Sequence, residues 1–280
     1  MTSHDPAMVG AMLRLFRDHA DEIVVAVDSR VDPRDLAPLV EAADTAVRFE
    51  QVGPPECSRP WLVQLCAHQT VLMVDGDEVP SAALLRDLSE LVADDTVVQS
   101  RIARRWCFPD ERHWLAERPW WPDYQRRLLR RGPELDFDLG IHGGVRPALP
   151  ARYVDEPVYH LACILATFAS RRNRARVYEA ARPGLVAVGG GPMNDTLYVP
   201  EHFATCPPDR TPDEDVALLR SVLGASADRA TRSPTPVELP LVTADEVAGH
   251  HPVDGLQAQG YRATLRVVEL DRRTEPGNDT

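Results

Sequence analysis

Two short apolar runs, each leading into carboxylates, stand out in the first third of the chain. Residues 23–27 are apolar without interruption and end at Asp28, and residues 71–74 lead directly into the acidic run 75–78. Unbroken apolar runs of this length are typical of strands in a parallel sheet that is covered on both faces. The pattern therefore predicts two buried strands with acidic groups at their carboxyl ends.

Segments with helical or strand-like spacing alternate around these two runs. Helices are expected over residues 6–19 (after an Asp5 cap), 32–43, 61–68 and 80–91, and further strands over 45–49 and 97–102. This alternation predicts an α/β fold with a doubly wound, mostly parallel sheet flanked by helices. Because ligands bind at the carboxyl ends of strands in such sheets, Asp28 and the acidic run are expected on one rim.

After residue 106 the regular alternation of predicted helices and strands ends. Residues 106–160 indicate short strands and loops rich in Trp and Arg, followed by an Arg-rich helix over 167–181 and a capped helix over 211–223. Residues 225–240 have the Ser, Thr, Pro and Arg content of a linker, and residues 261–270 alternate like a strand. We therefore expect a main domain over residues 1–224 and a linker with a short C-terminal extension over residues 225–280.

Composition and charge narrow the class of protein. Of the 280 residues, 44% are hydrophobic and 26% are charged, as in ordinary globular proteins. The formal net charge of -12 argues against a nucleic-acid partner, which would require a basic stripe. No apolar run approaches the ~20 residues of a membrane span, and the chain does not open on the basic-then-apolar order of a signal peptide. The sequence predicts a soluble, cytoplasmic protein with no transmembrane segment.

One acidic motif is distinguished by its context. Three Asp-x-Asp triplets occur, at 75/77, 136/138 and 213/215, about as many as this Asp content produces by chance. Only Asp75 and Asp77 directly follow an uncharged strand, and Gly76 between them permits a sharp turn. Carboxylates crowded at a strand end repel one another unless a cation compensates them, and oxygen ligands favour Mg²⁺ or Mn²⁺ together with phosphates. A metal–diphosphate site and a solvated acidic turn both fit this spacing.

Several segments in order resemble a known enzyme family. The chain is similar to family 2 glycosyltransferases of the GT-A fold, in the branch that includes lipopolysaccharide-core glucosyltransferases, over about residues 7–205. The segments that carry the resemblance are DEIVVAVDSRVD at 21–32, VLMVDGDE at 71–78, WPDYQRRLLRR at 121–131, IH at 141–142 and VYHL at 158–161.

The chain also departs from the family pattern in two places. The family places a first strand before the first helix, where this sequence has only residues 1–5, so that strand is expected to be missing or truncated. The Glu that usually follows the histidine at position 142 is replaced by Gly143.

The resemblance implies a hexosyltransferase, an enzyme that moves a sugar from a nucleotide-diphosphate donor to an acceptor hydroxyl. It also implies that the transfer inverts the configuration at the anomeric carbon. It implies that Asp75 and Asp77, flanking Gly76, hold Mn²⁺ or Mg²⁺ on the donor diphosphate. His142 or His160 would complete the metal shell, with a structural, hydrogen-bonded histidine as the alternative for each. Asp28 would contact the base or ribose of the donor, unless it only caps a helix.

The catalytic base is expected at Asp123, which matches the family segment, with Asp138 as the alternative. Arg126, in the Arg-rich run 126–131, is expected to clamp the diphosphate, unless the run is the solvated face of a strand. Trp120 and Trp121 suit either a sugar platform or the core.

The acceptor stays open between a glycan, a lipid-linked molecule and a small molecule. The main alternative is a catalytically inactive GT-A module that binds a nucleotide sugar or carbohydrate. A nucleotidyltransferase is disfavoured because the chain has no Lys and no Gly-rich phosphate loop.

Overall fold

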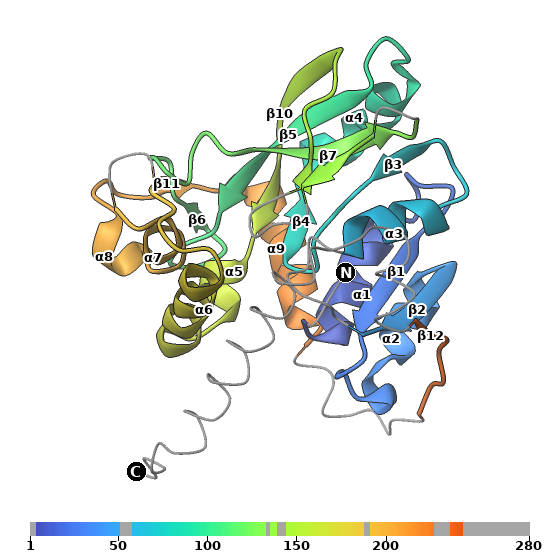
Figure 1. The fold of residues 1–280 in the computed structure, drawn as a ribbon, viewed down its shortest axis with the longest axis horizontal. Helices are drawn as coiled ribbons and strands as arrows, with labels where there is room; N and C mark the ends of the chain where they lie inside the picture. Colours follow the sequence, from blue (N-terminus) through green and yellow to red (C-terminus); the bar gives the residue numbers. More distant parts are fainter. Residues whose placement is uncertain are drawn as a thin grey trace.

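The computed structural model describes residues 4–50, 58–132, 135–138, 144–187, 191–226 and 236–242. It is a mixed α/β protein in which helices surround two main sheets (Figure 1). The helices are α1 (Pro6–Leu15), the 3₁₀ turn η1 (Pro33–Asp35), α2 (Ala37–Ala42), α3 (Arg59–Leu65), α4 (Ala82–Ala93), α5 (Ala162–Leu165), α6 (Phe168–Ala181), α7 (Met193–Tyr198), α8 (Pro200–Phe203) and α9 (Asp213–Gly224). No helix in these ranges is long and apolar enough to cross a membrane.

The strands form two main sheets and two small antiparallel pairs of strands. A parallel sheet has the order β1-β2-β12, and a mixed sheet has the order β3-β7-β5-β10-β4; β6 pairs with β11, and β8 pairs with β9. The strands are β1 (Val24–Asp28), β2 (Thr45–Phe49), β3 (Thr70–Leu72), β4 (Glu78–Pro80), β5 (Gln99–Trp106), β6 (His113–Trp114), β7 (Tyr124–Arg130), β8 (Phe137–Asp138), β9 (Gly144–Val145), β10 (Ala151–His160), β11 (Asp209–Arg210) and β12 (Leu241–Val242).

The sequence predicted one mostly parallel sheet, and this prediction is wrong for the five-stranded sheet, which is mixed. In the five-stranded sheet only β5 and β10 run parallel, while β3/β7, β7/β5 and β10/β4 are antiparallel. The cause lies after residue 106, where the chain returns from β5 to β7 through loops and the short strand β6, and a return without a crossover helix joins antiparallel strands.

Local signals placed most helices correctly. Helix α1 begins at Pro6 because the Asp5 carboxylate accepts the Ala7 N–H at 2.8 Å, as its sequence predicts. The predicted helix over 32–43 divides into η1 and α2, and residues 78–80, at the predicted start of the next helix, form β4 instead. Helix α4 then begins at Ala82, where the Ser81 hydroxyl accepts the Leu84 N–H at 3.0 Å.

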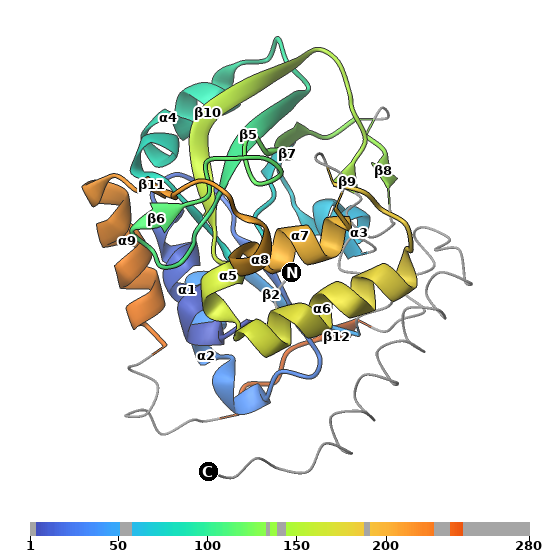
Figure 2. The ribbon, with the colours of Figure 1, turned by 90° about the vertical axis from the view of Figure 1, so that its left-hand side faces the viewer.

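The main core lies between the two sheets and helices α1, α2, α4 and α9. Met8 and Met12 of α1, Val27 of β1, Leu88 of α4 and Leu219 of α9 are all buried in it. A second core holds Trp106 and Trp120 beside helices α5 to α7, which lie at the front of Figure 2. Trp120 is therefore a core residue, in agreement with one of its two interpretations.

The two main sheets meet around a cavity. Within the described residues, β1 pairs only with β2 and β3 pairs only with β7, so each strand has a second edge with no strand on it. A cavity of about 190 Å³ lies between these edges, lined by Val24, Thr70 and Leu72 and covered by Phe16 of α1 and Leu88 of α4.

Part of the expected C-terminal extension packs on the main domain. Strand β12 pairs with β2, the Val237 N–H donates to the Pro33 carbonyl at 3.0 Å, and Val237 and Leu239 pack against the main core. The strand-like segment 261–270 lies outside the described residues.

Candidate functional site

The acidic run lies where the chain passes from one edge of the five-stranded sheet to the other. Strands β3 and β4 occupy opposite edges, and the residues between them include the turn at Gly76 and Asp77. The Glu78 N–H donates to the Asp75 carbonyl at 3.0 Å, and the Leu161 N–H donates to the Asp77 carbonyl at 2.8 Å. These bonds fix the backbone of the short connection between β3 and β4, which carries the carboxylates of Asp75, Asp77 and Glu78. The acidic run therefore follows a strand end, as the sequence predicted.

Asp75 is held by two guanidinium groups. Its carboxylate accepts from Arg59 Nη2 at 3.2 and 3.3 Å and from Arg127 Nη2 at 2.6 Å. Burial would raise the pKa of Asp75, but the charges of Arg127 and Arg59 outweigh it and hold the pKa well below its usual range. The side chain of Asp75 is 31% exposed, whereas that of Arg127 is 3% exposed. Asp75 is thus the most accessible carboxylate of the acidic run.

A chain of alternating charges continues behind Asp75. Arg127 also donates to Glu78, which is fully buried, and Arg104 Nη1 lies 3.5 Å from the same Glu78 carboxylate. Arg104 Nε then donates to Asp123 Oδ2 at 2.7 Å. A buried charge is costly unless it is paired with an opposite charge. Each carboxylate and guanidinium in this chain therefore holds its neighbours in position.

Asp123 has little capacity left to act as a base. Besides Arg104, Trp106 Nε1 donates to it at 2.9 Å and Gln125 Nε2 at 2.5 Å. Burial raises the pKa of Asp123, but Arg104 and these hydrogen bonds lower it by more, so the net pKa is below its ordinary value. A carboxylate with three donors and a lowered pKa is a weak proton acceptor, which favours a positioning role for Asp123 over the expected catalytic one.

Asp77 faces two histidines. His160 Nε2 lies 3.3 Å and His4 Nε2 lies 3.5 Å from Asp77 Oδ2. Burial opposes ionisation, yet His160, with His4, holds the pKa of Asp77 below its usual range. His160 also packs edge-on against Trp106, with ring centroids 4.1 Å apart, and its Nδ1 is buried with no hydrogen-bond partner.

The cations that the acidic run requires are present in the protein itself. Arg59, Arg104 and Arg127 compensate Asp75, Glu78 and Asp123, so mutual repulsion of these carboxylates does not by itself demand a metal. In the described ranges, no group of three or more His, Cys, Asp or Glu side chains is arranged to hold a metal ion. The residues fit only a metal that draws most of its ligands from elsewhere, as Mg²⁺ does from phosphates and water.

Asp28 lies at the carboxyl end of β1, as expected, and is 1% exposed. Its carboxylate accepts the Arg30 backbone N–H at 2.9 Å and the Arg30 guanidinium at 2.5–3.1 Å. This geometry ties the turn after β1 to its own strand, and it gives Asp28 a structural role whether or not a ligand binds beside it.

The arginine in the acidic site is Arg127, one position beyond the expected Arg126. The register of β7 shifts at this point, and the two guanidiniums have different partners: Arg126 Nη1 donates to the Val145 carbonyl at 2.9 Å, whereas Arg127 donates to Asp75 and Glu78. Trp121 packs edge-on against Trp114, with ring centroids 5.2 Å apart, and near Tyr124 on β7. His142 lies outside the described residues.

Asp138 lies near the acidic run by way of the β8/β9 pair. Asp138 opposes Gly144 in that pair, and a Cβ added to Gly144 would lie 3.2 Å from Arg59 Nη1, the guanidinium that binds Asp75. Asp138 is exposed, unlike Asp123.

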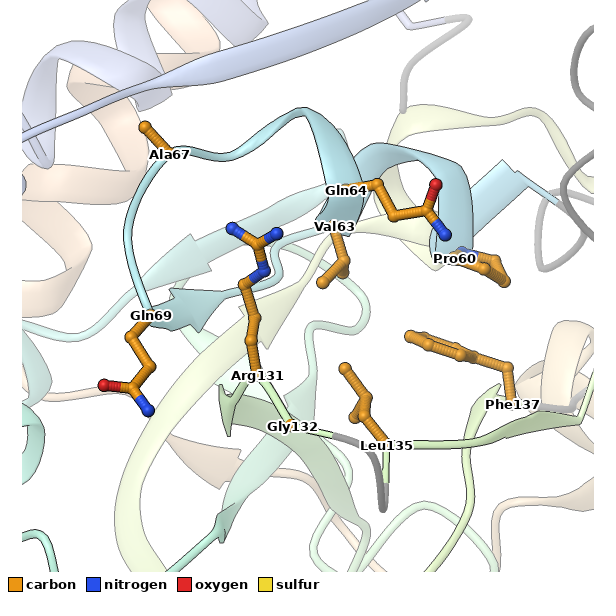
Figure 3. Close-up of a pocket in the computed structure, with 9 residues that line it drawn as sticks. All are labelled: Pro60, Val63, Gln64, Ala67, Gln69, Arg131, Gly132, Leu135 and Phe137. Atoms are coloured by element: carbon orange, nitrogen blue, oxygen red, sulfur yellow. The ribbon is translucent and has the colours of Figure 1, made fainter.

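A hollow of about 480 Å³ lies between helix α3 and strand β8 (Figure 3). One wall is helix α3, which contributes Pro60, Val63 and Gln64. The facing wall contains Leu135 and Phe137, whose side chains point toward α3. Arg59 and Asp138 are not among its lining residues; each is the sequence neighbour of one, Pro60 and Phe137 respectively.

The sequence did not point to Arg59 and Arg104. Both lie in segments without a distinctive motif, and they meet the acidic run only through folding. Their one available signal was charge, because arginines are almost never fully buried unless they are paired. No protein-family model matches the chain, and no curated protein matches it.

Proposed function

We propose that this protein transfers a sugar from a nucleotide-diphosphate donor to an acceptor hydroxyl. The observation that carries the proposal is the strand-end acidic run with its open end at Asp75 and Arg59 and with buried guanidiniums behind it. A site with fixed charges of both signs suits the two demands of the reaction, to neutralise a leaving diphosphate and to take up a proton. The resemblance to family 2 glycosyltransferases supports the same reaction.

The donor diphosphate would lie against Arg59. This guanidinium is 17% exposed and its bonds to Asp75 are long, whereas Arg127 is held by two carboxylates. Arg59 is therefore the more accessible of the two cations, and its forked geometry matches phosphate oxygens. The metal expected from the sequence, Mn²⁺ or Mg²⁺, would be held by Asp75 and Asp77 and would supply further charge neutralisation of the diphosphate.

The acceptor would occupy the hollow beside α3. Its walls mix apolar side chains with the amide of Gln64, as a sugar or another polyol requires. The acceptor oxygen attacks the anomeric carbon, the bond from that carbon to the diphosphate breaks, and the proton passes to the Asp138 carboxylate. The electron pair of the broken bond leaves on the diphosphate, next to Arg59.

Calorimetric titration with UDP and with GDP, with Mn²⁺ and after chelation, tests donor binding. Arg59→Gln should weaken nucleotide binding about tenfold, the loss of one charge-assisted contact, whereas the control Arg34→Gln, an exposed arginine paired with Asp32, should change nothing. Unchanged affinity in Arg59→Gln contradicts the donor site. Equal affinity with and without Mn²⁺ removes the metal role alone.

A turnover assay tests the base. Asp138→Asn should reduce sugar transfer by about 10²–10⁴-fold and leave nucleotide affinity intact. If Asp138→Asn transfers at the rate of the unmodified protein while Asp123→Asn does not, the base is Asp123, as first expected.

A binding module without catalysis is the second candidate. The observation that favours it is Asp123, whose carboxylate is saturated by three donors. Nucleotide binding in calorimetry, without transfer or slow donor hydrolysis from any common nucleotide sugar, would select this candidate.

A further inference from the structure

Two arginines and a tyrosine form a row across the centre of the five-stranded sheet. Strands β7, β5 and β10 lie side by side (Figure 1), and Arg101 of β5 is in register with Arg126 on one side and with Tyr153 on the other. Residues in register on neighbouring strands share a face of the sheet. Arg101 Nη1 donates to Tyr153 Oη at 2.7 Å, and its guanidinium carbon lies 5.1 Å from the centre of the Tyr153 ring.

The row shares no residue with the acidic site but lies beside it. Arg101 and Arg104 are three positions apart on β5 and point to opposite faces, because side chains alternate along a strand. Arg126 donates to the Val145 carbonyl of β9, whose neighbour Gly144 lies beside Arg59. The row is therefore distinct from the proposed donor site in its residues, but it is not remote from it.

The two arginines lack a counter-charge. In the part of the chain that the structure describes, neither Arg101 nor Arg126 forms an ion pair, although the chain has 43 acidic residues against 31 basic ones. Like charges directly opposite each other in a sheet are unfavourable. Burial and the charge of Arg101 together lower the pKa of Arg126. The pair is thus held together at an electrostatic cost that a bound anion would relieve.

Both guanidiniums also have unused hydrogen-bonding capacity. The Nε atoms of Arg101 and Arg126 are buried and have no hydrogen-bond partner among the residues that the structure describes. The Asp155 carboxylate accepts the Tyr124 hydroxyl and, within the described residues, forms no ion pair with either arginine. Buried donors without an acceptor are uncommon in folded proteins, and an oxyanion between the two arginines would supply acceptors.

An open aromatic surface adjoins the pair. Tyr153 is 60% exposed, and its ring meets that of Tyr124 edge-on, with centroids 4.8 Å apart. An exposed, braced aromatic ring offers an apolar face to a flat ligand, while the cations beside it select for negative charge.

We propose that Arg101, Arg126 and Tyr153 form a binding site for a sugar that carries an anionic group. The carboxylate or phosphate of the ligand lies between the two guanidiniums, and the sugar ring packs on Tyr153. This site shares no residue with the proposed donor site, so the proposal does not rest on the transferase chemistry.

Titration of the full chain, followed by calorimetry or ligand-observed NMR, tests the site. The probes are glucuronate and glucose 6-phosphate, which distinguish a carboxylate from a phosphate, with glucose and inorganic phosphate as the uncharged and ring-free controls. At least one charged sugar should bind more tightly than both controls. Arg101→Gln and Arg126→Gln should each weaken that binding about tenfold, the loss of one charge-assisted contact.

Two further variants separate the site from general effects. Tyr153→Ala, at an exposed position that does not endanger folding, should reduce the affinity for the charged sugar to that for inorganic phosphate. Arg86→Gln, an exposed arginine paired with Glu214, should bind the charged sugar like the unmodified protein. Equal binding of the charged sugar and inorganic phosphate, or unchanged binding in both Arg101→Gln and Arg126→Gln, overturns the proposal.

Discussion

At the scale of single residues, the main feature is that each carboxylate of the acidic site has its own cation. Arg127 joins Asp75 to Glu78, and Arg104 joins Glu78 to Asp123. Breaking a buried pair by removing one partner costs about 3–5 kcal/mol, because the other charge is then left unpaired. The acidic site therefore contributes to the stability of the five-stranded sheet as well as to its chemistry.

Asp123→Asn should make the protein less stable and less sensitive to acid. The folded-state pKa of Asp123 lies below its unfolded value of about 3.9, so its ionised form stabilises the protein above that pH. This contribution is lost as the pH falls from about 5 through the lowered pKa of the folded state. We expect the free energy of unfolding to fall by about 3 kcal/mol at pH 7, and the decline below pH 5 to be shallower than in the unmodified protein. Urea unfolding at a series of pH values measures both effects.

The control for this experiment is Asp87→Asn, at an exposed position on α4. It should change stability by less than about 0.5 kcal/mol at any pH. An Asp123→Asn protein whose stability difference from the unmodified chain is as large at pH 3 as at pH 7 would exclude this electrostatic explanation.

At the scale of elements, the start of α4 depends on a residue far away in the chain. Asp215 of α9 is buried, and its carboxylate accepts the Ala82 N–H at 2.8 Å and the Tyr159 hydroxyl at 2.7 Å. The local cap, Ser81, satisfies one further N–H of the same helix. Helix α4 thus has a local cap and a distant one.

Asp215→Ala should be more damaging than Ser81→Ala. Loss of a serine cap costs about 1 kcal/mol, whereas Asp215→Ala leaves two buried donors without their charged acceptor, at about 1–3 kcal/mol each. Urea midpoints of the two variants test the order, with the exposed neighbour Asp213→Ala expected within about 0.5 kcal/mol of the unmodified protein. A larger loss in Ser81→Ala than in Asp215→Ala would show that the local cap dominates.

The elements also show what the sequence alone was able to predict. Strand β2 spans the predicted residues 45–49, and α1, α4, α6 and α9 lie close to their predicted ranges, because helical spacing is a local signal. The cap predicted for α9 is wrong, since its N-cap residue is Pro212 and no side chain caps it. Strand partners depend on long-range contacts, so the order β3-β7-β5-β10-β4 was not accessible.

The same distinction holds for the candidate site. The acidic run was placed correctly at a strand end, while its partners Arg59 and Arg127 lie 16 and 52 positions away from Asp75 along the chain. Within the run 126–131, the choice between Arg126 and Arg127 depends on the register of β7, which shifts at this point, and the sequence pattern does not state it.

At the scale of the whole molecule, the protein consists of two sheets with a common core. The parallel sheet carries Asp28, and the five-stranded sheet carries the acidic run and the arginine pair. The sheets are joined by helices α1, α4 and α9 and are separated by the cavity between β1 and β3.

Filling this cavity should stabilise the protein. Val24 lines it from β1, and Val24→Ile adds one methylene while keeping a β-branched side chain, so the packing of the two sheets against each other should improve. We expect a gain of about 0.5–1 kcal/mol, and a melting temperature higher by roughly 1–4 °C. The matched control is Val158→Ile on β10, where the side chain is 1% exposed in a filled core, and the added methylene should destabilise by about 1–3 kcal/mol. Differential scanning calorimetry compares the two. If Val24→Ile lowers the melting temperature as Val158→Ile does, the space between β1 and β3 is already filled in solution, and the two sheets are not separated there.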